Sequence, residues 1–342
     1  MQAQTWYEDI RADSGNIVSS RIRLARNLMA YHFPRKIGAE QAAELIELAR
    51  DAAKSAGART GELTYTDVAG LHDVMKVAML ERHIISAEML NRSVCGLLSS
   101  PDGSLAVMLN EEDHIRIQSF RTGDDIGTAF EIAESTDNAL EEQLDYAFSK
   151  DLGYLTSCPS NTGTGMRASF MLHLPLLERN NQMRNIISAL TKFGMTIRGV
   201  FGEGSESFGS FYQISNQVTL GKSEQEIIES LKNVTSQICE KESILIQKAL
   251  SRERHDISDN VHRSYAILGS CRRIGAKEAM SLLSNVRMGF GADVLEMPRP
   301  ERSLLSIMMN IRDANIHIMC GQTSSEPKDV CRADYLRSVF KG

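Results

Sequence analysis

Strand-like stretches that follow one another without a helix between them constrain the fold of this 342-residue chain most. Residues 94–121 place a Pro-Asp-Gly turn between two apolar runs and then alternate around Ile115 and Ile117, which is typical of hairpins. Glycine-rich loops separate further expected strands near 154–157, 166–174, 195–201 and 210–217. Since no regular βαβ alternation is present, the pattern favours an antiparallel-rich α/β or α+β domain. We predict the α+β class, an antiparallel sheet flanked by helices.

Apolar residues at helical spacing predict the flanking helices. Residues 40–56 carry Leu45, Ile46, Ala49 and Ala52 on one stripe. Similar helices are expected over 69–82, 124–150, 179–192 and 223–254, the last behind a Ser-x-x-Glu cap.

After residue 255 the expected secondary structure changes from mixed strands and helices to helices alone. Four helices are expected there: from Ser258 towards Cys271, over 276–287, over 302–312 and from Pro327. The predicted domains are a leader at 1–15, a catalytic domain at 16–255 and a small helical domain at 256–342.

Composition excludes several classes of protein. Hydrophobic residues make up 42% and charged residues 24%, which is ordinary for a globular chain and argues against disorder. The net charge of −6 means that any anion site must be a local concentration of arginine, and it gives no sign of nucleic-acid binding. The polar N-terminus has no signal core, and no apolar run approaches the roughly 18–20 residues of a membrane span. The six scattered cysteines form no C-x-x-C pair, so a reduced cytoplasmic protein is the simplest interpretation.

The first motif with chemical content is S-S-R-I-R-L-A-R-N at 19–27. In a strand, Arg21 and Arg23 would project from the same face, which suits them to gripping adjacent phosphates. A solvated basic strand end is the commoner explanation for such a segment taken alone.

The second motif, N-E-E-D-H-I-R-I-Q at 110–118, sets Glu111 and Glu112 beside an aspartate. These carboxylates repel one another unless a cation is near. A carboxylate here could hold a guanidinium bidentately, or take its proton during phosphoryl transfer. An acidic turn remains an equal alternative.

The third motif, C-P-S-N-T-G-T-G-M-R-A-S at 158–169, lacks the lysine of a P-loop. Its backbone could nonetheless approach a ligand closely and lead Arg167 into a strand. Cys158 is either a packed thiol, the usual state of a lone cysteine, or a polarised thiolate near a guanidinium.

The fourth motif, R-G-V-F-G-E-G-S-E-S-F-G at 198–209, carries Glu203 and Glu206 on a glycine-rich loop after Arg198. A flexible loop that closes a carboxylate over a substrate is a common catalytic device. A plain surface hairpin would have a similar sequence. His83, in E-R-H-I-I-S, gives a weaker signal, since a core or capping histidine is at least as common.

In this order, the four motifs resemble those of the phosphagen kinases, the creatine and arginine kinase superfamily. The resemblance covers roughly residues 16–250 and rests on S-S-R-I-R, N-E-E-D-H-x-R, C-P-x-N-x-G-T-G-x-R-A-S and R-G-x-x-G-E-x-S-E. The helical domain that precedes the first motif in kinases of small guanidines is missing here, and a helical region follows the last motif instead. That arrangement resembles the one in the bacterial protein-arginine kinases, and the C-terminal segments S-Y-A-I-L-G and K-E-A-M-S-L-L-S-N-V-R-M-G are similar to theirs.

The resemblance implies ATP-dependent phosphorylation of arginine residues in proteins and a role for individual residues. Five arginines would surround the ATP phosphates and neutralise the transferring phosphoryl group: Arg21, Arg23, Arg116, Arg167 and Arg198. The rest of the nucleotide site would comprise Ser19, Ser20, Ile22, His83, Ala168, Ser169, Phe170, Met171, Gly199, Val200, Phe201 and Gly202.

The catalytic set implied by the resemblance is Glu111, Glu112, Cys158 and Glu203. Glu112 and Glu203 would clamp the substrate guanidinium, with Glu112 favoured as the base. Because a free guanidinium has a pKa above 12, its deprotonation is expected late and coupled to transfer. Mg²⁺ would be held largely by the ATP phosphates with help from Glu111.

The resemblance also implies a regulatory site for phosphoarginine at an R-D-x-x-R-A motif, present here as K-D-V-C-R-A at 328–333. Lys328 keeps the charge of the first arginine but loses its planar fork. Asp329 and Arg332, followed by Ala333, would bind the guanidinium and phosphoryl ends; an i,i+3 surface ion pair is the alternative. Further implied features are a homodimer, an activator protein, Clp-type protease machinery and a role in stress control.

Two alternatives stay open. A phosphagen kinase acting on a free small guanidine is disfavoured by the missing N-terminal domain. A catalytically inactive phosphoarginine-binding adaptor is disfavoured by the intact carboxylates and by the presence of all five arginines.

Overall fold

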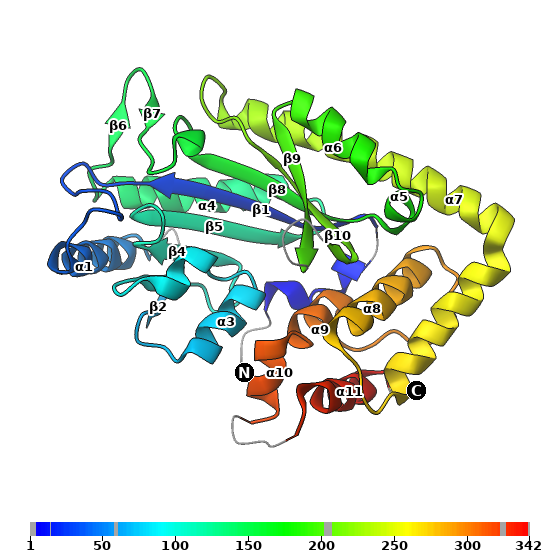
Figure 1. Cartoon of the computed structure of the whole chain (residues 1–342). Coiled ribbons are helices and arrows are strands. Elements are labelled where there is room, and N and C mark those ends of the chain that lie inside the picture. The colour runs from blue at the N-terminus through cyan, green and yellow to red at the C-terminus, as the bar shows by residue number, and fades with distance from the viewer. Residues whose placement is uncertain (1–4, 14, 58–60, 202–206, 322–325, 341–342) are drawn as a thin grey trace.

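The computed structural model describes residues 5–13, 15–57, 61–201, 207–321 and 326–340. Within these residues, eight strands form one sheet in the order β2-β3-β4-β5-β1-β8-β10-β9, and every neighbouring pair is antiparallel (Figure 1). The strands are β1 (Ile17–Arg26), β2 (Thr64–Asp67), β3 (Gly96–Ser99), β4 (Leu105–Leu109), β5 (Ile115–Thr122), β8 (Met166–His173), β9 (Met195–Phe201) and β10 (Ser207–Asn216). A separate ribbon pairs β6 (Phe148–Ser149) with β7 (Gly153–Tyr154). The predicted antiparallel α+β class is confirmed.

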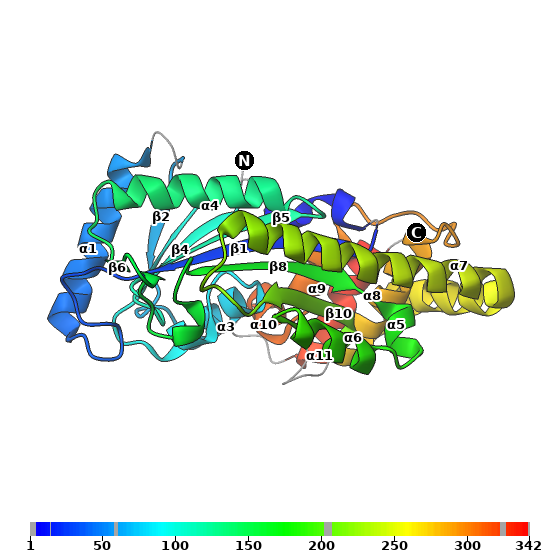
Figure 2. The same ribbon diagram turned by 90° about the horizontal axis from the view of Figure 1, so that it is seen from above.

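Helices cover one face of the sheet and also build a C-terminal region. Figure 2 shows α4 (Ile126–Glu141) and α7 (Glu224–Ser270) along one face, with α1 (Ala39–Ser55) beyond them. The other helices are α3 (Asp73–Glu81), α5 (Pro175–Arg179), α6 (Met183–Lys192), α8 (Ala276–Gly291), α9 (Leu304–Asn310), α10 (Asp313–Met319) and α11 (Lys328–Val339). None of the described helices is both long and apolar enough to cross a membrane.

A first hydrophobic core lies between the sheet and α1, α4 and the first half of α7. Alternate residues of β1, Ile22 and Leu24, are buried in it with residues of β4, β5 and β8. On α4, Ala129 and Ala133 are fully buried, and their small side chains let the helix lie close to the strands. The predicted apolar stripe of α1 is buried in this core as well.

A second core joins the other face of the sheet to the C-terminal helices. Phe120 and Phe211 from the strands pack there with helical residues such as Leu283. Trp6 and Tyr7, within the segment 1–15 expected to be a leader, also pack here. The Trp6 ring stacks on Phe120 at 4.8 Å, and the Asp13 carboxylate accepts the Leu304 N–H at 2.9 and 3.0 Å.

Several predicted element boundaries differ from the observed ones. Helix α7 runs to Ser270 as two helical parts that meet at a kink at Glu253, which agrees with the expected helix end near 254 and the expected second helix from Ser258. Helix α4 ends at Glu141, because backbone bonds such as Ala147 N–H to Asn27 O (2.7 Å) draw the following segment against the end of β1. The expected strand at 154–157 is reduced to β7, and the single expected helix over 302–312 is followed by a separate α10.

A buried ion pair between the sheet and α4 offers a test of this packing. Arg26 donates to the Asp137 carboxylate at 2.5 and 3.0 Å, and its guanidinium lies 3.5 Å from the Tyr154 ring centroid. Removing one charge leaves the other buried and uncompensated, so Asp137→Asn should lower the free energy of unfolding by about 3 kcal/mol in urea titrations. The exposed pair Lys54–Asp51 supplies the control: Lys54→Ala should leave stability unchanged within error. A loss below about 1 kcal/mol for Asp137→Asn would contradict the prediction.

Candidate active site

The strand register brings five arginines to one face of the sheet, and we call them the arginine cluster (Arg21, Arg23, Arg116, Arg167 and Arg198). Arg23 on β1 lies opposite Arg167 on β8 and Gln118 on β5. Arg116 lies opposite Ala25, two residues along the same face. Gln213 on β10 lies opposite Met171 on β8 and also opposite Arg198 on β9. Since Met171 shares the face of Arg167 on β8, Arg198 lies on that face as well. Because directly opposed residues share a face, the whole cluster points away from α4.

The arginine cluster is electrostatically strained. Burial and the neighbouring guanidinium groups of Arg116 and Arg167 lower the pKa of Arg21 to about 9. Burial and the same neighbours, with Arg21, hold the pKa of Arg23 well below its ordinary value. Among the described residues, the buried Nε atoms of Arg21 and Arg23 have no hydrogen-bond partner. Buried donors of like charge without partners are suited to an anion with several oxygens.

One acidic side chain compensates part of this charge. Glu111 is fully buried in the turn between β4 and β5, and its two oxygens accept from Arg116 Nη1 at 2.7 and 2.8 Å. Burial alone would raise the pKa of Glu111, but Arg116 outweighs it and the pKa is lowered. Glu111 is therefore ionised and committed to holding Arg116.

The pKa of the neighbouring carboxylate, Glu112, shifts in the opposite direction. Burial, followed by the charge of Asp113, raises the pKa of Glu112, with smaller contributions from Glu111 and Glu88. Its side chain is half-buried, and its carboxylate has no hydrogen bond within the described part of the chain. Glu112 thus combines proximity to the arginine cluster with a raised proton affinity, as a general base requires.

Asp113 and His114 fix the turn that presents these glutamates. The buried Asp113 carboxylate accepts from Asn27 Nδ2 and from the Ser157 backbone N–H, both at 2.7 Å. His114 Nδ1 accepts the Leu28 N–H at 3.0 Å. The Ser157 bond ties the Cys158 segment to the acidic turn, and Cys158 lies near enough to Arg167 to affect its pKa. Sequence reasoning missed this anchoring role, although both residues stand within the N-E-E-D-H motif.

The His83 segment closes one end of the arginine cluster. His83 has a positive φ of 59°, and its carbonyl accepts from Gln118 Nε2 at 3.0 Å. Burial, then the charges of Arg21, Arg312 and Arg23, lower the pKa of His83 to about 3. His83 is therefore neutral, so it can donate or accept a hydrogen bond without adding charge to the cluster.

Some residues expected in the nucleotide site do not lie beside the arginine cluster. Ile22, Ala168 and Phe170 face the first core, and Ser20 donates to the Gly123 carbonyl at 2.6 Å, also away from the cluster. Strand alternation explains this, since each of them neighbours in sequence a residue on the other face. Ser19 and Met171 are buried, Ser169 lies opposite Arg21, and Gly199 and Val200 follow Arg198 on β9. Gly202, Glu203 and Glu206 lie outside the described residues.

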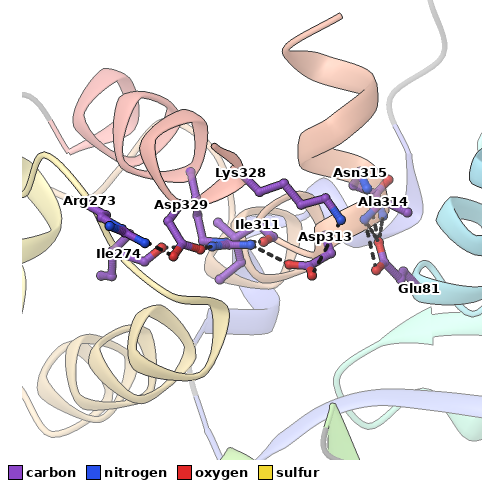
Figure 3. A network of polar contacts seen from close by, with 10 residues as sticks. Glu81, Arg273, Ile274, Ile311, Asp313, Ala314, Asn315, Lys328 and Asp329 are labelled. Atoms are coloured by element: carbon purple, nitrogen blue, oxygen red, sulfur yellow. Dashed lines mark hydrogen bonds and ion pairs between the residues drawn. The ribbon is translucent and has the colours of Figure 1, made fainter. Parts of the chain in front are cut away.

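The predicted regulatory residues lie in the first two turns of α11, where Figure 3 shows Lys328 and Asp329 on either side of a polar network. Arg332 is 1% exposed and donates to Asp329 (2.7 Å), Asp313 (2.5 Å) and the carbonyls of Ile274 and Ile311 (both 2.8 Å). Lys328 Nζ lies 3.9 Å from Asp313, and Ala333 is buried beside Arg332. Arg332 is therefore the buried centre of a network, not one half of a surface ion pair.

Comparison with known proteins defines the class first. Residues 44–245 match the family model of the ATP:guanido phosphotransferase C-terminal catalytic domain, and the chain belongs to this family. A lombricine kinase structure aligns with a TM-score of 0.58 and 26% identity over 72% of this chain and 69% of that one. A duplicated taurocyamine kinase from Schistosoma mansoni, at 22% identity, has the same fold (TM-score 0.59; 79% of this chain and 42% of that one).

The C-terminal region then identifies the particular group of kinases within this family. Residues 254–342 match the Protein-arginine kinase McsB C-terminal domain. A protein-arginine kinase of Clostridium acetobutylicum is 36% identical over 99% of this chain and all of its own length. One from Syntrophomonas wolfei is 38% identical over 96% of this chain and 93% of its own. Within the ATP:guanido phosphotransferases, the chain thus belongs to the protein-arginine kinase family, and the predicted resemblance is confirmed.

The strain within the arginine cluster predicts a stability effect. Arg23→Met keeps much of the side-chain volume and removes one of the mutually repelling charges. We expect the free energy of unfolding without nucleotide to rise by about 1–2 kcal/mol in urea titrations.

Arg263 supplies the control because it is an exposed arginine paired only loosely with Asp259 at 3.8 Å. Arg263→Met should leave stability unchanged within error. A clear loss of stability in Arg23→Met would show that attractive contacts outweigh the repulsion.

Proposed function

We propose that this protein transfers the γ-phosphoryl group of ATP to the guanidino group of arginine residues in other proteins. The observation that carries the proposal is the convergence of the arginine cluster on one sheet face, with buried donors free to receive phosphate oxygens. Phosphoryl transfer depends mainly on such positioning and charge neutralisation. The protein-arginine kinases to which the chain is related supply the acceptor class.

The geometry supports a direct transfer in which Glu112 serves as the base. A guanidino nitrogen attacks the γ-phosphorus, an N–P bond forms, the bond from phosphorus to the bridging oxygen breaks, and ADP leaves. The proton lost by the guanidinium passes to Glu112, whose raised pKa favours accepting it. Glu111 contributes indirectly, by holding Arg116 where the phosphates would lie. Glu203 would clamp the other side of the guanidinium.

Mg²⁺ is proposed to arrive with ATP and to neutralise its phosphates. The described residues contain no group of three or more His, Cys, Asp or Glu side chains that could hold a metal ion alone. Both Glu111 oxygens accept from Arg116, whereas the half-buried Glu112 carboxylate accepts no hydrogen bond among the described residues. This favours a metal held chiefly by phosphate oxygens.

A phosphotransfer assay tests the proposal. Incubation with ATP and an arginine-rich protein should yield acid-labile phosphoarginine, detected by mass spectrometry. Free arginine offered alongside separates protein phosphorylation from a small-guanidine kinase activity. No product on either acceptor, under conditions where a related kinase works, would refute the proposal.

The Glu112→Gln variant probes the base. It keeps the size of the side chain but cannot take the proton, so kcat should fall by about 10²–10⁴-fold while the affinity for ATP stays nearly constant. Glu134→Gln, on the exposed side of α4, is the matched control and should keep full turnover. An equal loss of ATP affinity and kcat in Glu112→Gln would assign Glu112 to nucleotide binding.

The pH dependence follows from the raised pKa of Glu112. The ionised form is the active base, so kcat/KM should rise with pH through the Glu112 pKa and fall away below it. This acid limb should lie above the pKa range of an ordinary glutamate. His83, with a pKa of about 3, should contribute no step near neutrality, so His83→Gln should leave the position of the limb unchanged. A profile flat from pH 5 to 9 would contradict the assignment.

We also propose that Lys328, Asp329, Arg332 and Ala333 form an allosteric phosphoarginine site. The support is chemical: the exposed Lys328 would meet the phosphoryl end and Asp329 the guanidinium end, and the buried Arg332 would orient Asp329, to which it is bonded at 2.7 Å. From the resemblance alone, we propose a homodimer, an activator protein and Clp-type protease machinery as partners, and a role in stress control. A reducing cytoplasmic setting agrees with the six cysteines, all of which are free thiols.

A further inference from the structure

An arginine of the C-terminal region reaches the edge of the candidate nucleotide site. Arg312 Nη1 donates to the Phe201 carbonyl at 3.0 Å, and the Arg312 guanidinium lies 5.7 Å from the centroid of the Phe201 ring. Arg312 is also close enough to His83 to be among the charges that act on it. No local sequence pattern marks Arg312, because its partners are more than a hundred residues away.

Phe201 needs support of this kind. It has a φ of 67°, a left-handed conformation that bulky side chains rarely adopt, and it is the last residue of β9. Its ring packs 5.6 Å from that of Phe211 and 5.8 Å from that of His83. The conformation of Phe201 therefore sets both the end of the strand that carries Arg198 and the packing of His83.

Arg312 is itself held in place from two sides. It directly precedes α10, whose Ala314 and Asn315 N–H groups donate to the Glu81 carboxylate at 3.1–3.2 Å (Figure 3). Glu81 ends α3, two residues before His83. On the other side, Asp313 accepts from Arg332 at 2.5 Å. The position of Arg312 is thus fixed both to the His83 segment and to the start of α11.

We propose that Arg312 is a positioning residue of the nucleotide site, which acts by holding Phe201 and, through its ring, His83 in the arrangement that receives ATP. The proposal rests on the assignment of this face of the sheet to ATP. It makes the C-terminal region a part of the ATP site, although none of the motif segments lies there. Among the described residues, the Arg312 guanidinium acts through its hydrogen bond to the Phe201 carbonyl and its contact with the Phe201 ring.

Three full-length proteins test the proposal: wild type, Arg312→Ala and Arg312→Lys. Arg312→Ala should weaken ATP binding and raise the KM for ATP roughly tenfold, as expected for the loss of one charged hydrogen bond. The kcat and the KM for the protein substrate should change less than about threefold. Arg312→Lys can still donate to the Phe201 carbonyl but loses the planar group, so its affinity should lie between the two.

Arg263→Ala is the matched control, since it removes one positive charge from the same helical region at an exposed position. Its ATP affinity should equal that of the wild type. A purely structural role for Arg312 would reduce the active fraction, and hence the apparent kcat, without changing the KM for ATP. That outcome, or an unchanged ATP affinity in Arg312→Ala, overturns the proposal.

ATP binding is measured by calorimetry, separately from transfer, so that two failures can be told apart. A wild type that binds ATP but phosphorylates no arginine refutes the proposed function, while the binding series still decides the role of Arg312. Normal transfer with identical ATP affinity in all variants refutes only the role of Arg312. Should Arg312→Ala not fold, a folded Arg312→Lys with wild-type affinity also overturns it.

Discussion

Repulsion among guanidinium groups on one face of a rigid sheet is the constraint on which the rest of the structure depends. Burial and then the charges of neighbouring arginines lower the pKa values of Arg21, Arg23 and Arg167, and the buried Nε atoms of Arg21 and Arg23 have no partner among the described residues. Such an arrangement persists only where the backbone has no freedom to relieve it. The antiparallel ladder supplies this rigidity, because β1 is paired on both sides and its opposite face is buried beneath α4.

The two glutamates of the β4–β5 turn, Glu111 and Glu112, have different chemical roles because their environments differ. Both are next to Arg116, but only Glu111 is bonded to it, and the two pKa values shift in opposite directions. Separating two like groups in this way is how a protein obtains a permanent charge and a proton acceptor from adjacent residues. The separation depends on Asp113, whose bonds to Asn27 and Ser157 orient the turn.

Local sequence patterns predicted which residues share a strand face or a helix face. They could not predict features that depend on contacts between residues far apart in the sequence. Alternation placed Arg21 and Arg23 on one face, and the helical stripe of α1 was found in the core. The pairing of Arg23 with Arg167 depends on strand register, which no single segment encodes. The same alternation turns Ile22 away from the arginine cluster, although the motif contains it. The contact of Arg312 with Phe201 depends on tertiary packing alone.

Helix α7, 47 residues long and kinked at Glu253, takes part in both hydrophobic cores. Its first half contributes Leu231 to the core under the sheet, and its second half contributes Val261 to the core of the C-terminal region. The two helical parts meet at a kink at Glu253, whose backbone (φ −128°, ψ 29°) is not helical (Figure 1). Moving the C-terminal helices away from the sheet would expose the apolar side chains that they bury against it, such as Phe120 and Phe211. The bend at Glu253 therefore lets one continuous segment of chain contribute a buried apolar face to each of the two cores.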